Sequence, residues 1–327
     1  MIRFLFLYPI SMLIHVIIAL RNKLYDLGCL QIIKSKKIII SIGNIQLGGT
    51  GKTPFVAALA QQLIEKNLNP IIISRGYKRL TKDAIIFTNI DKYNARHVGD
   101  EPYYLKSLLK TVPIIVDNNK KRAIKTANSF KGVDCILLDD GYQSRYIDKD
   151  LDIVLINTWV SDRFFKLMPL GYLREPIHNL NRAHFIYTTK GSQSKHLFKN
   201  YKTKHVDIEY QLIKYKNYEI EKNVKIKKCE NEHIVAFCGI ATSEHFFETL
   251  ELLKIQVDQK MVFNNHHVYT KKDFSITSQK KIIFITTQKD FVKLDLLESE
   301  IYVLDMKINI NDNFLLQKIK ETINENN

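Results

Sequence analysis

One short segment of the chain combines the residue types that bind phosphate. Gly48-Gly49-Thr50-Gly51-Lys52-Thr53 lies between an apolar run and a segment with helical periodicity. In that context the backbone N–H groups of the glycines converge on phosphate oxygens, Lys52 reaches the β- and γ-phosphates of a nucleotide, and Thr53 offers its hydroxyl to Mg²⁺. Gln46 departs from the strict G-x-x-x-x-G-K-[ST] pattern. The strand–loop–helix context nevertheless favours a nucleotide site over a chance glycine turn.

A pair of carboxylates follows a second buried run. In CILLDD, residues 135–140, an apolar stretch leads into Asp139 and Asp140. A nucleotide site of this type needs a carboxylate on the metal side, at the end of another buried strand. Alone, paired aspartates after a strand are more often a turn or a helix cap. Together with Lys52 and Thr53, they supply both halves of a Mg·ATP site in the expected order.

The composition is that of an ordinary globular protein. Of 327 residues, 45% are hydrophobic and 25% charged, which excludes a disordered tail and fits about two domains. Lys plus Arg number 49 against 34 Asp plus Glu, and the net charge of +15 fits nucleic acid, acidic lipid or a phosphorylated substrate. Compositional drift in the source genome would give the same charge. No basic aromatic motif of a nucleic-acid-binding module is visible, so we expect no nucleic-acid partner. The 4 cysteines form no C-x-x-C pair, which indicates a reducing compartment.

The N-terminal segment raises the question of a membrane. Residues 4–20 are almost entirely apolar and are followed by Arg21, but the run is short of the about 20 residues that span a bilayer. No cleavage site follows it, which argues against a signal peptide. Apolar residues recur at helical spacing from Ile10, while Ser11 and His15 mark another face. This pattern favours an amphipathic helix lying in the interface. A buried core helix is the alternative.

The elements that position these groups follow from periodicity. Apolar runs typical of buried strands occupy 36–44, 70–74, 113–117, 134–139, 152–156, 233–240, 281–287 and 301–305. Helical patterns occupy 53–66, 102–110, 119–128, 243–254 and 312–324. Continuous apolar strands alternating with helices predict a mostly parallel sheet covered on both faces. The fold class is therefore α/β, with a P-loop NTPase-like sheet flanked by helices, a second smaller α/β domain and an N-terminal membrane-associating helix.

A composition break divides the chain. The stretch from about 191 to 230 is rich in lysine and tyrosine and weakly periodic. We predict an N-terminal helical segment over 1–35, a P-loop nucleotide-binding domain over 36–190, a linker over 191–230 and a smaller α/β domain over 231–327.

Several runs, taken together, resemble the tetraacyldisaccharide 4′-kinase family, the lipid A 4′-kinases of Gram-negative bacteria. The matching runs are SIGNIQLGGTGKTP (41–54), ISRGYK (73–78), VGDEP (98–102), LLDDGYQS (137–144), PLGYLREP (169–176), AFCGIA (236–241) and TTQKD (286–290). The resemblance implies transfer of the γ-phosphate of ATP, with Mg²⁺, to the 4′-hydroxyl of a tetraacylated disaccharide 1-phosphate. It places the enzyme at the cytoplasmic face of the bacterial inner membrane. An anionic glycolipid substrate and an anionic membrane surface would account for the positive charge.

The resemblance also implies roles for individual residues. Asp100 in VGDEP corresponds to the family's catalytic base, although from the sequence alone a helix N-cap is the simpler interpretation. His266 corresponds to the histidine that pairs with this aspartate. Asn265 stands before it where the family usually has Asp, which leaves the orientation of the imidazole in question.

Other family positions near substrate or nucleotide are matched by Arg75, Tyr77, Arg122 and Gln143. Arg122 lies in a basic run, which is usually a solvated face. Lys289 and Asp290 match a family signature without an assigned role.

A rival from another class is a membrane-associated regulatory ATPase of the partition type. Such proteins share the G-G-x-G-K-T loop but place a signature lysine before its glycines. That position is Leu47 here, which argues against this alternative.

Overall fold

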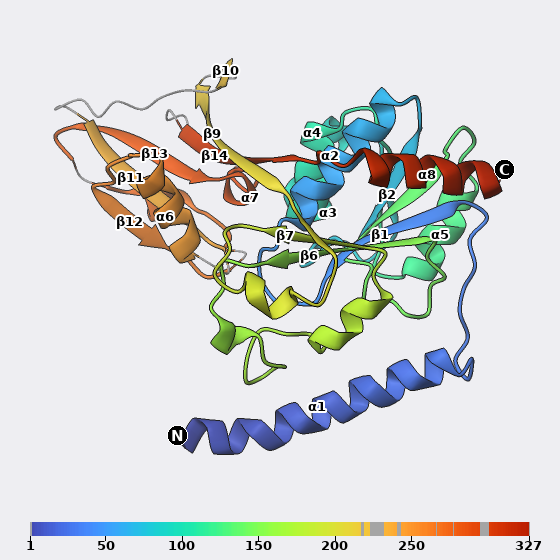
Figure 1. Cartoon of the computed structure of the whole chain (residues 1–327). Helices are drawn as coiled ribbons and strands as arrows, with labels where there is room; N and C mark the ends of the chain where they lie inside the picture. Colours follow the sequence, from blue (N-terminus) through green and yellow to red (C-terminus); the bar gives the residue numbers. More distant parts are fainter. Residues whose placement is uncertain are drawn as a thin grey trace.

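Two β-sheets and their flanking helices make up the protein. The computed structural model describes residues 2–216, 219–222, 232–240, 243–265, 267–276, 278–294 and 301–326. The first sheet has 8 strands in the order β3-β4-β2-β5-β1-β6-β7-β8, and the second has 6 strands in the order β10-β9-β14-β13-β11-β12. Figure 1 shows the two sheets beside each other, with helix α1 running along one side of the larger part.

The first sheet is parallel except for its edge strand β3. Its strands are β1 (Ile38–Asn44), β2 (Pro70–Ser74), β3 (Ile85–Phe87), β4 (Ile114–Val116), β5 (Cys135–Asp139), β6 (Leu151–Asn157), β7 (Phe185–Thr189) and β8 (Thr203–His205). Its helices are α2 (Lys52–Glu65), α3 (Ala95–Val98), α4 (Asp100–Leu108) and α5 (Lys120–Asn128). Because the strands are parallel, their carboxyl ends meet at one edge of the sheet, where ligands of α/β proteins bind.

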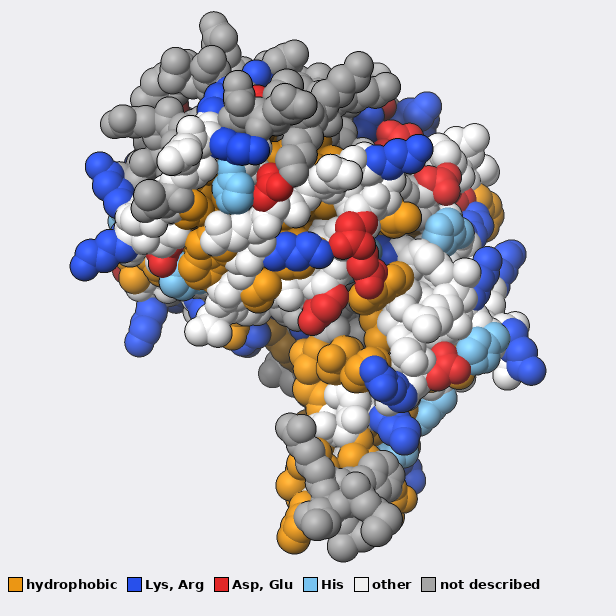
Figure 2. All heavy atoms as spheres, turned by 90° about the vertical axis from the view of Figure 1, so that its left-hand side faces the viewer, with side chains coloured by type: hydrophobic (Ala, Val, Ile, Leu, Met, Phe, Trp, Pro, Cys, Tyr) orange, Lys and Arg blue, Asp and Glu red, His pale blue; other side chains and the backbone are white. Residues whose placement is uncertain are grey.

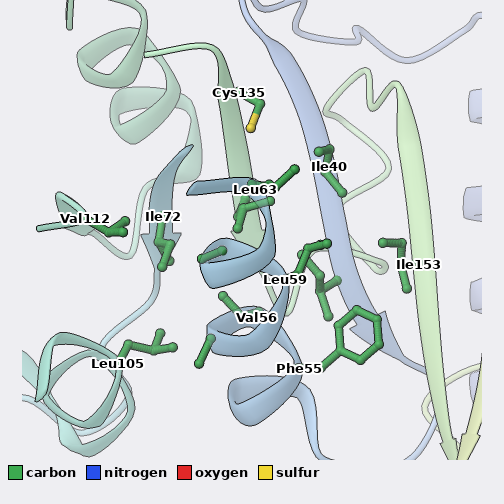
Figure 3. Packing of buried hydrophobic residues seen from close by; sticks show 14 of the residues in the cluster. Ile40, Phe55, Val56, Leu59, Leu63, Ile72, Leu105, Val112, Cys135 and Ile153 are labelled. Atoms are coloured by element: carbon green, nitrogen blue, oxygen red, sulfur yellow. The ribbon is translucent and has the colours of Figure 1, made fainter. Parts of the chain in front are cut away.

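Alternate residues of each strand enter the two hydrophobic layers. On β1, Ile38 and Ile40 belong to the layer covered by α2 and α4, and Ile39 belongs to the layer covered by α5. Figure 3 shows Phe55, Val56, Leu59 and Leu63 of α2 pointing at the sheet. The helix that carries the phosphate loop is thus fixed by packing along its whole length.

The second sheet is parallel from β12 through β14 and antiparallel at β9 and β10. Its strands are β9 (Asp207–Lys216), β10 (Glu219–Lys222), β11 (Glu232–Cys238), β12 (Gln259–Val262), β13 (Lys281–Thr287) and β14 (Ile301–Asn309), with helices α6 (Ser243–Leu252) and α7 (Gln288–Phe291). The long β9–β14 ladder leads back to the first sheet. There the last helix, α8 (Asn313–Asn326), buries Leu315, Ile319 and Ile323 in the same core as α2.

Helix α1 (Ile2–Asp26) lies on the protein with its polar face inward. Ser11, Ile18 and Asn22 are buried, and the Ser11 hydroxyl donates to the carbonyl of Leu167 at 3.1 Å. The apolar side chains on the other face, Phe6, Ile10, Met12, Leu13, Val16, Ile17 and Leu20, are exposed. Figure 2 shows the N-terminal part of α1, with hydrophobic side chains at its surface, projecting below the body of the protein. The core-helix alternative is wrong, since only 11% of the apolar window in Phe6–Asp26 is buried.

The predicted α/β class, with a second smaller sheet and an N-terminal apolar helix, is confirmed. Each apolar run predicted as a strand is a strand, and each helical pattern is a helix within a few residues. Strands β3, β7, β8, β9, β10 and β12 were not predicted. The domain boundaries stay a prediction; within 191–230, β8 extends the first sheet and β9 joins the second.

Candidate active site at the carboxyl edge of the first sheet

The phosphate loop, residues 48–53, connects β1 to α2 at the carboxyl edge of the sheet. Gly51 caps α2 with φ 85°, a left-handed conformation that side-chain-bearing residues rarely adopt. The Asn44 amide donates to Oγ1 of Thr50 at 3.0 Å. Gln46, where the strict pattern has glycine, exchanges hydrogen bonds with the backbone of Asn157 at 3.2 and 2.8 Å. Gln46 thus connects the start of the phosphate loop to the end of β6.

Asp139 ends β5, directly beside β1. Its Oδ2 accepts from the Ser74 hydroxyl at 3.2 Å. Its Oδ1 is buried and has no hydrogen-bond partner within the described ranges. Burial first, then the negative charges of Glu101 and Asp140, raises the pKa of Asp139 to about 7. An acidic oxygen left unpaired at a loop that binds phosphate is the group a cation would satisfy.

Asp140 lies among cations. Lys52 Nζ is 3.4 Å from its Oδ1, and Arg174 Nη1 is 3.0 Å from its Oδ2. Burial alone would raise the pKa of Asp140, but the charges of Lys52, Arg174 and Lys120 outweigh it and hold the pKa well below its usual value. Lys120 donates to the Asp140 carbonyl at 2.6 Å, which stabilises the turn that follows β5. Asp140 therefore stays ionised beside Lys52.

Asp100 is positioned by two glycines from different motifs. Gly76 of SRGY and Gly99 of VGDEP touch, since a Cβ on Gly99 would lie 2.9 Å from Cα of Gly76. This contact brings the chain around Arg75 against the start of α4. Gly99 takes the N-cap position and Asp100 begins the helix. The N-cap interpretation of Asp100 therefore does not describe its position, and its half-buried side chain lies in the first turn of α4.

Lys289, to which the sequence motifs assign no role, links the second sheet to helix α4, which packs on the first sheet. Its Nζ lies 2.7 Å from Oε1 of Glu101, which follows Asp100 on α4. The charge of Lys289 is the main cause that lowers the pKa of Glu101, against its burial. The neighbouring Asp290 is buried and accepts from the Gly239 N–H at 3.0 Å and the Thr287 hydroxyl at 2.7 Å. Through these two hydrogen bonds, Asp290 connects the turn that follows β11 with the end of β13.

The remaining predicted residues are spread around this edge. Gln143 donates to the carbonyl of Asn44 at 2.7 Å, beneath the phosphate loop. Arg122 forms a bidentate pair with Asp117 at 2.7 and 2.9 Å. Arg75 and Tyr77 are exposed at the end of β2. His266 lies outside the described residues.

Arg174 is a site residue that sequence reasoning missed. It belongs to PLGYLREP, so the motif match held the signal. Only the fold shows that it contacts Asp140.

A parallel α/β sheet with a phosphate loop, and with acidic residues on the adjacent strand, defines the class of P-loop phosphate-transferring enzymes. The model of the tetraacyldisaccharide-1-P 4′-kinase family matches residues 3–324, and the chain belongs to this family. The match confirms the predicted family and enzyme class, and it favours the kinase over the partition-type ATPase.

Individual relatives agree over nearly the whole chain. The tetraacyldisaccharide 4′-kinase of Aquifex aeolicus is 32% identical over 96% of this chain and 96% of its own. That of Francisella novicida is 34% identical over 93% of this chain and 94% of its own. The crystal structure of LpxK from Aquifex aeolicus in complex with ATP superposes with a TM-score of 0.75 at 30% identity, covering 97% of this chain and 98% of that one.

Proposed function

We propose that this kinase transfers the γ-phosphate of ATP to the 4′-hydroxyl of a tetraacylated disaccharide 1-phosphate, at the cytoplasmic surface of the inner membrane. One observation carries the proposal. Residues 167–174 touch α1 at one end, where Leu167 accepts from Ser11, and the phosphate-loop region at the other, where the Arg174 N–H donates to the Ile45 carbonyl at 2.7 Å. The nucleotide edge is therefore next to the helix that presents an apolar face.

Nucleotide binding would use the phosphate loop. The N–H groups of residues 48–53 and the start of α2 would cradle the β- and γ-phosphates, and Lys52 would follow the transferred group. The described residues contain no cluster of three or more metal-binding side chains that could hold an ion alone. This fits Mg²⁺, which proteins usually hold with one or two carboxylates and the substrate phosphates. Thr53, Asp139 and Asp140 would hold it, and the bound cation would neutralise charge on the phosphates.

Asp100 would act as the base, paired with His266. In this scheme the Asp100 carboxylate accepts the proton of the 4′-hydroxyl as that oxygen bonds to the γ-phosphorus. The bond between the γ-phosphorus and the bridging oxygen breaks, and ADP leaves with its electron pair. Arg174 and Lys52, both beside Asp140, supply positive charge where negative charge collects. Arg75, Tyr77, Arg122 and Gln143 stay proposals for contacts with the substrate.

Membrane association would use α1. A soluble protein normally buries the apolar face of an amphipathic helix and exposes the polar face. Here Ser11 and Asn22 face the protein while Leu13, Ile17 and Leu20 face outward. A large exposed apolar face marks an interaction site. Arg21 at its end would add attraction to anionic lipid headgroups.

The direct test is incubation of purified protein with radiolabelled ATP, Mg²⁺ and the disaccharide 1-phosphate lipid in mixed micelles. We expect a bis-phosphorylated lipid. Its formation should fall by about a hundredfold or more in the Lys52→Ala variant, because a transition-state contact is lost. A folded wild-type protein that binds ATP but forms no such product would contradict the proposed substrate.

A further inference from the structure

A lysine outside the sequence motifs points at the phosphate loop from the side opposite the acidic residues. Lys190 follows β7 directly and has φ 57°, in the left-handed region. The turn is held by the Thr158 hydroxyl, which donates to the Gly191 carbonyl at 2.6 Å, and by the Thr189 hydroxyl, which donates to the Thr50 carbonyl at 3.1 Å. Nζ of Lys190 lies 3.9 Å from the position that a Cβ on Gly49 would occupy. Its backbone is thus constrained so that the ammonium reaches the loop.

Among the described residues, none supplies a counter-ion to the ammonium of Lys190. Across the part of the chain that the structure describes, it makes no hydrogen bond or ion pair. Burial, and then the positive charge of Lys289, lowers the pKa of Lys190 to about 8. Burial, and then the charge of Lys190, lowers the pKa of the nearby His245 to about 3. The imidazole is therefore neutral and supplies no negative charge to Lys190. A cation so placed is unfavourable until an anion arrives.

We propose that Lys190 is a nucleotide-binding residue whose ammonium pairs with a polyphosphate oxygen of bound ATP. The inference rests on the proposed function. Strand order supports it: β5, with Asp139, lies on one side of β1, and β7, which leads to Lys190, lies on the other side beyond β6. A nucleotide seated on the phosphate loop would be held by Lys52 and the metal at one flank and by Lys190 at the other.

The matched test uses Lys190→Met, which keeps the length of the side chain without its charge, and Lys190→Arg, which keeps the charge. Lys195→Met removes an exposed lysine nearby and serves as the control.

The Kd of MgATP is measured by calorimetry and by the fluorescence emission of Trp159, the only tryptophan. It lies 3.7 Å from the Cβ position of Gly191. We expect Lys190→Met to weaken MgATP binding by about 10- to 100-fold, the range for a lost bond to a charged group. Lys190→Arg should recover part of the affinity, and the control should bind normally.

Two further measurements separate a binding role from a structural one. Removal of an unpaired, half-buried charge should leave the melting temperature of the nucleotide-free protein unchanged or higher, whereas loss of a structural lysine would lower it. Inorganic tripolyphosphate, as a competitor, should lose the same factor of affinity as ATP. Equal tripolyphosphate affinity in wild type and Lys190→Met, or unchanged MgATP affinity, would overturn the proposal. If wild type itself bound no ATP, the proposed function would fail instead.

Discussion

At the scale of single residues, Asp139 and Asp140 are chain neighbours whose pKa values move in opposite directions. Burial dominates at Asp139, while Lys52 and Arg174 dominate at Asp140. At neutral pH, without metal, Asp140 is ionised and Asp139 holds a proton for part of the time. If Asp139 holds Mg²⁺ as proposed, binding of the ion should release a proton from this carboxyl group.

This difference predicts how Asp139→Asn changes stability. The folded pKa of about 7 lies above the ordinary value of 3.8, so the folded protein binds the proton more tightly and loses stability as pH rises from about 4 to 7. An amide does not titrate. Without metal, the variant should be more stable than wild type above pH 7, by on the order of a few kcal/mol. The difference should vanish below about pH 4. Denaturant unfolding with EDTA across this range checks the prediction, and a constant difference at all pH values would contradict it.

Asp100→Asn tests the base. The amide keeps the shape of the side chain but cannot accept a proton, so kcat should fall by about a hundredfold to ten-thousandfold. Because Gly99 occupies the N-cap, the helix should lose little stability, and the Kd of ATP should change little. Single-turnover kinetics and melting temperature are measured together. A normal kcat would remove Asp100 from the mechanism.

At the scale of elements, α1 offers a prediction from its reversed orientation. Val16→Glu with Leu20→Glu places charge on the exposed apolar face, so sedimentation with anionic liposomes should drop while the melting temperature stays the same. Ser11→Ala is the control on the inward face. It removes the hydrogen bond to Leu167 and should lower stability by about 1 kcal/mol without releasing the protein from liposomes. Full liposome binding by the double variant would contradict anchoring through this face.

Most strands that are buried along their whole length were predictable from the sequence, although β7, which is also buried throughout, was not. Strands β1, β5 and β6 are continuous apolar runs because helices or loops cover both sides. Strand β9 reads DIEYQLIKYK, with apolar residues mostly at alternate positions, and this period-two pattern lay inside the region predicted as linker. The lysine- and tyrosine-rich composition of this region suggested a linker, although the alternating apolar residues of β9 indicated a strand.

The site was predictable where chemistry is local in sequence. The phosphate loop and the two aspartates come together because parallel strands end at one edge. Arg174 and Lys190 act through contacts across long sequence separations, with Asp140 and with the loop around Gly49. The match to PLGYLREP marks out Arg174, but no local pattern distinguishes Lys190 from a surface cation.

At the scale of the whole molecule, the Lys289–Glu101 pair links the second sheet to α4. Lys289→Met leaves the Glu101 carboxylate without its cation and loosens the sheets beside Asp100, so turnover should fall. In a double-mutant cycle with Glu101→Gln, measured by denaturant unfolding, we expect a coupling of about 1 kcal/mol for this partly exposed pair. Lys260→Met breaks an ion pair within the second sheet's own surface, at 2.9 Å from Glu251, and is the control for turnover. Equal turnover in the two variants would contradict a bridging role.

The return of α8 to the first sheet affects how the protein is made. Leu315, Ile319 and Ile323 share a core with Phe55 of α2, and the Asp312 carboxylate, ahead of α8, accepts from the Tyr187 hydroxyl at 2.5 Å. During synthesis, α1 leaves the ribosome before α8. The apolar face of α1 is therefore free to meet lipid while the nucleotide-binding core still lacks its final helix. Emergence of α8, and not of the phosphate loop alone, completes the core on which α2 packs.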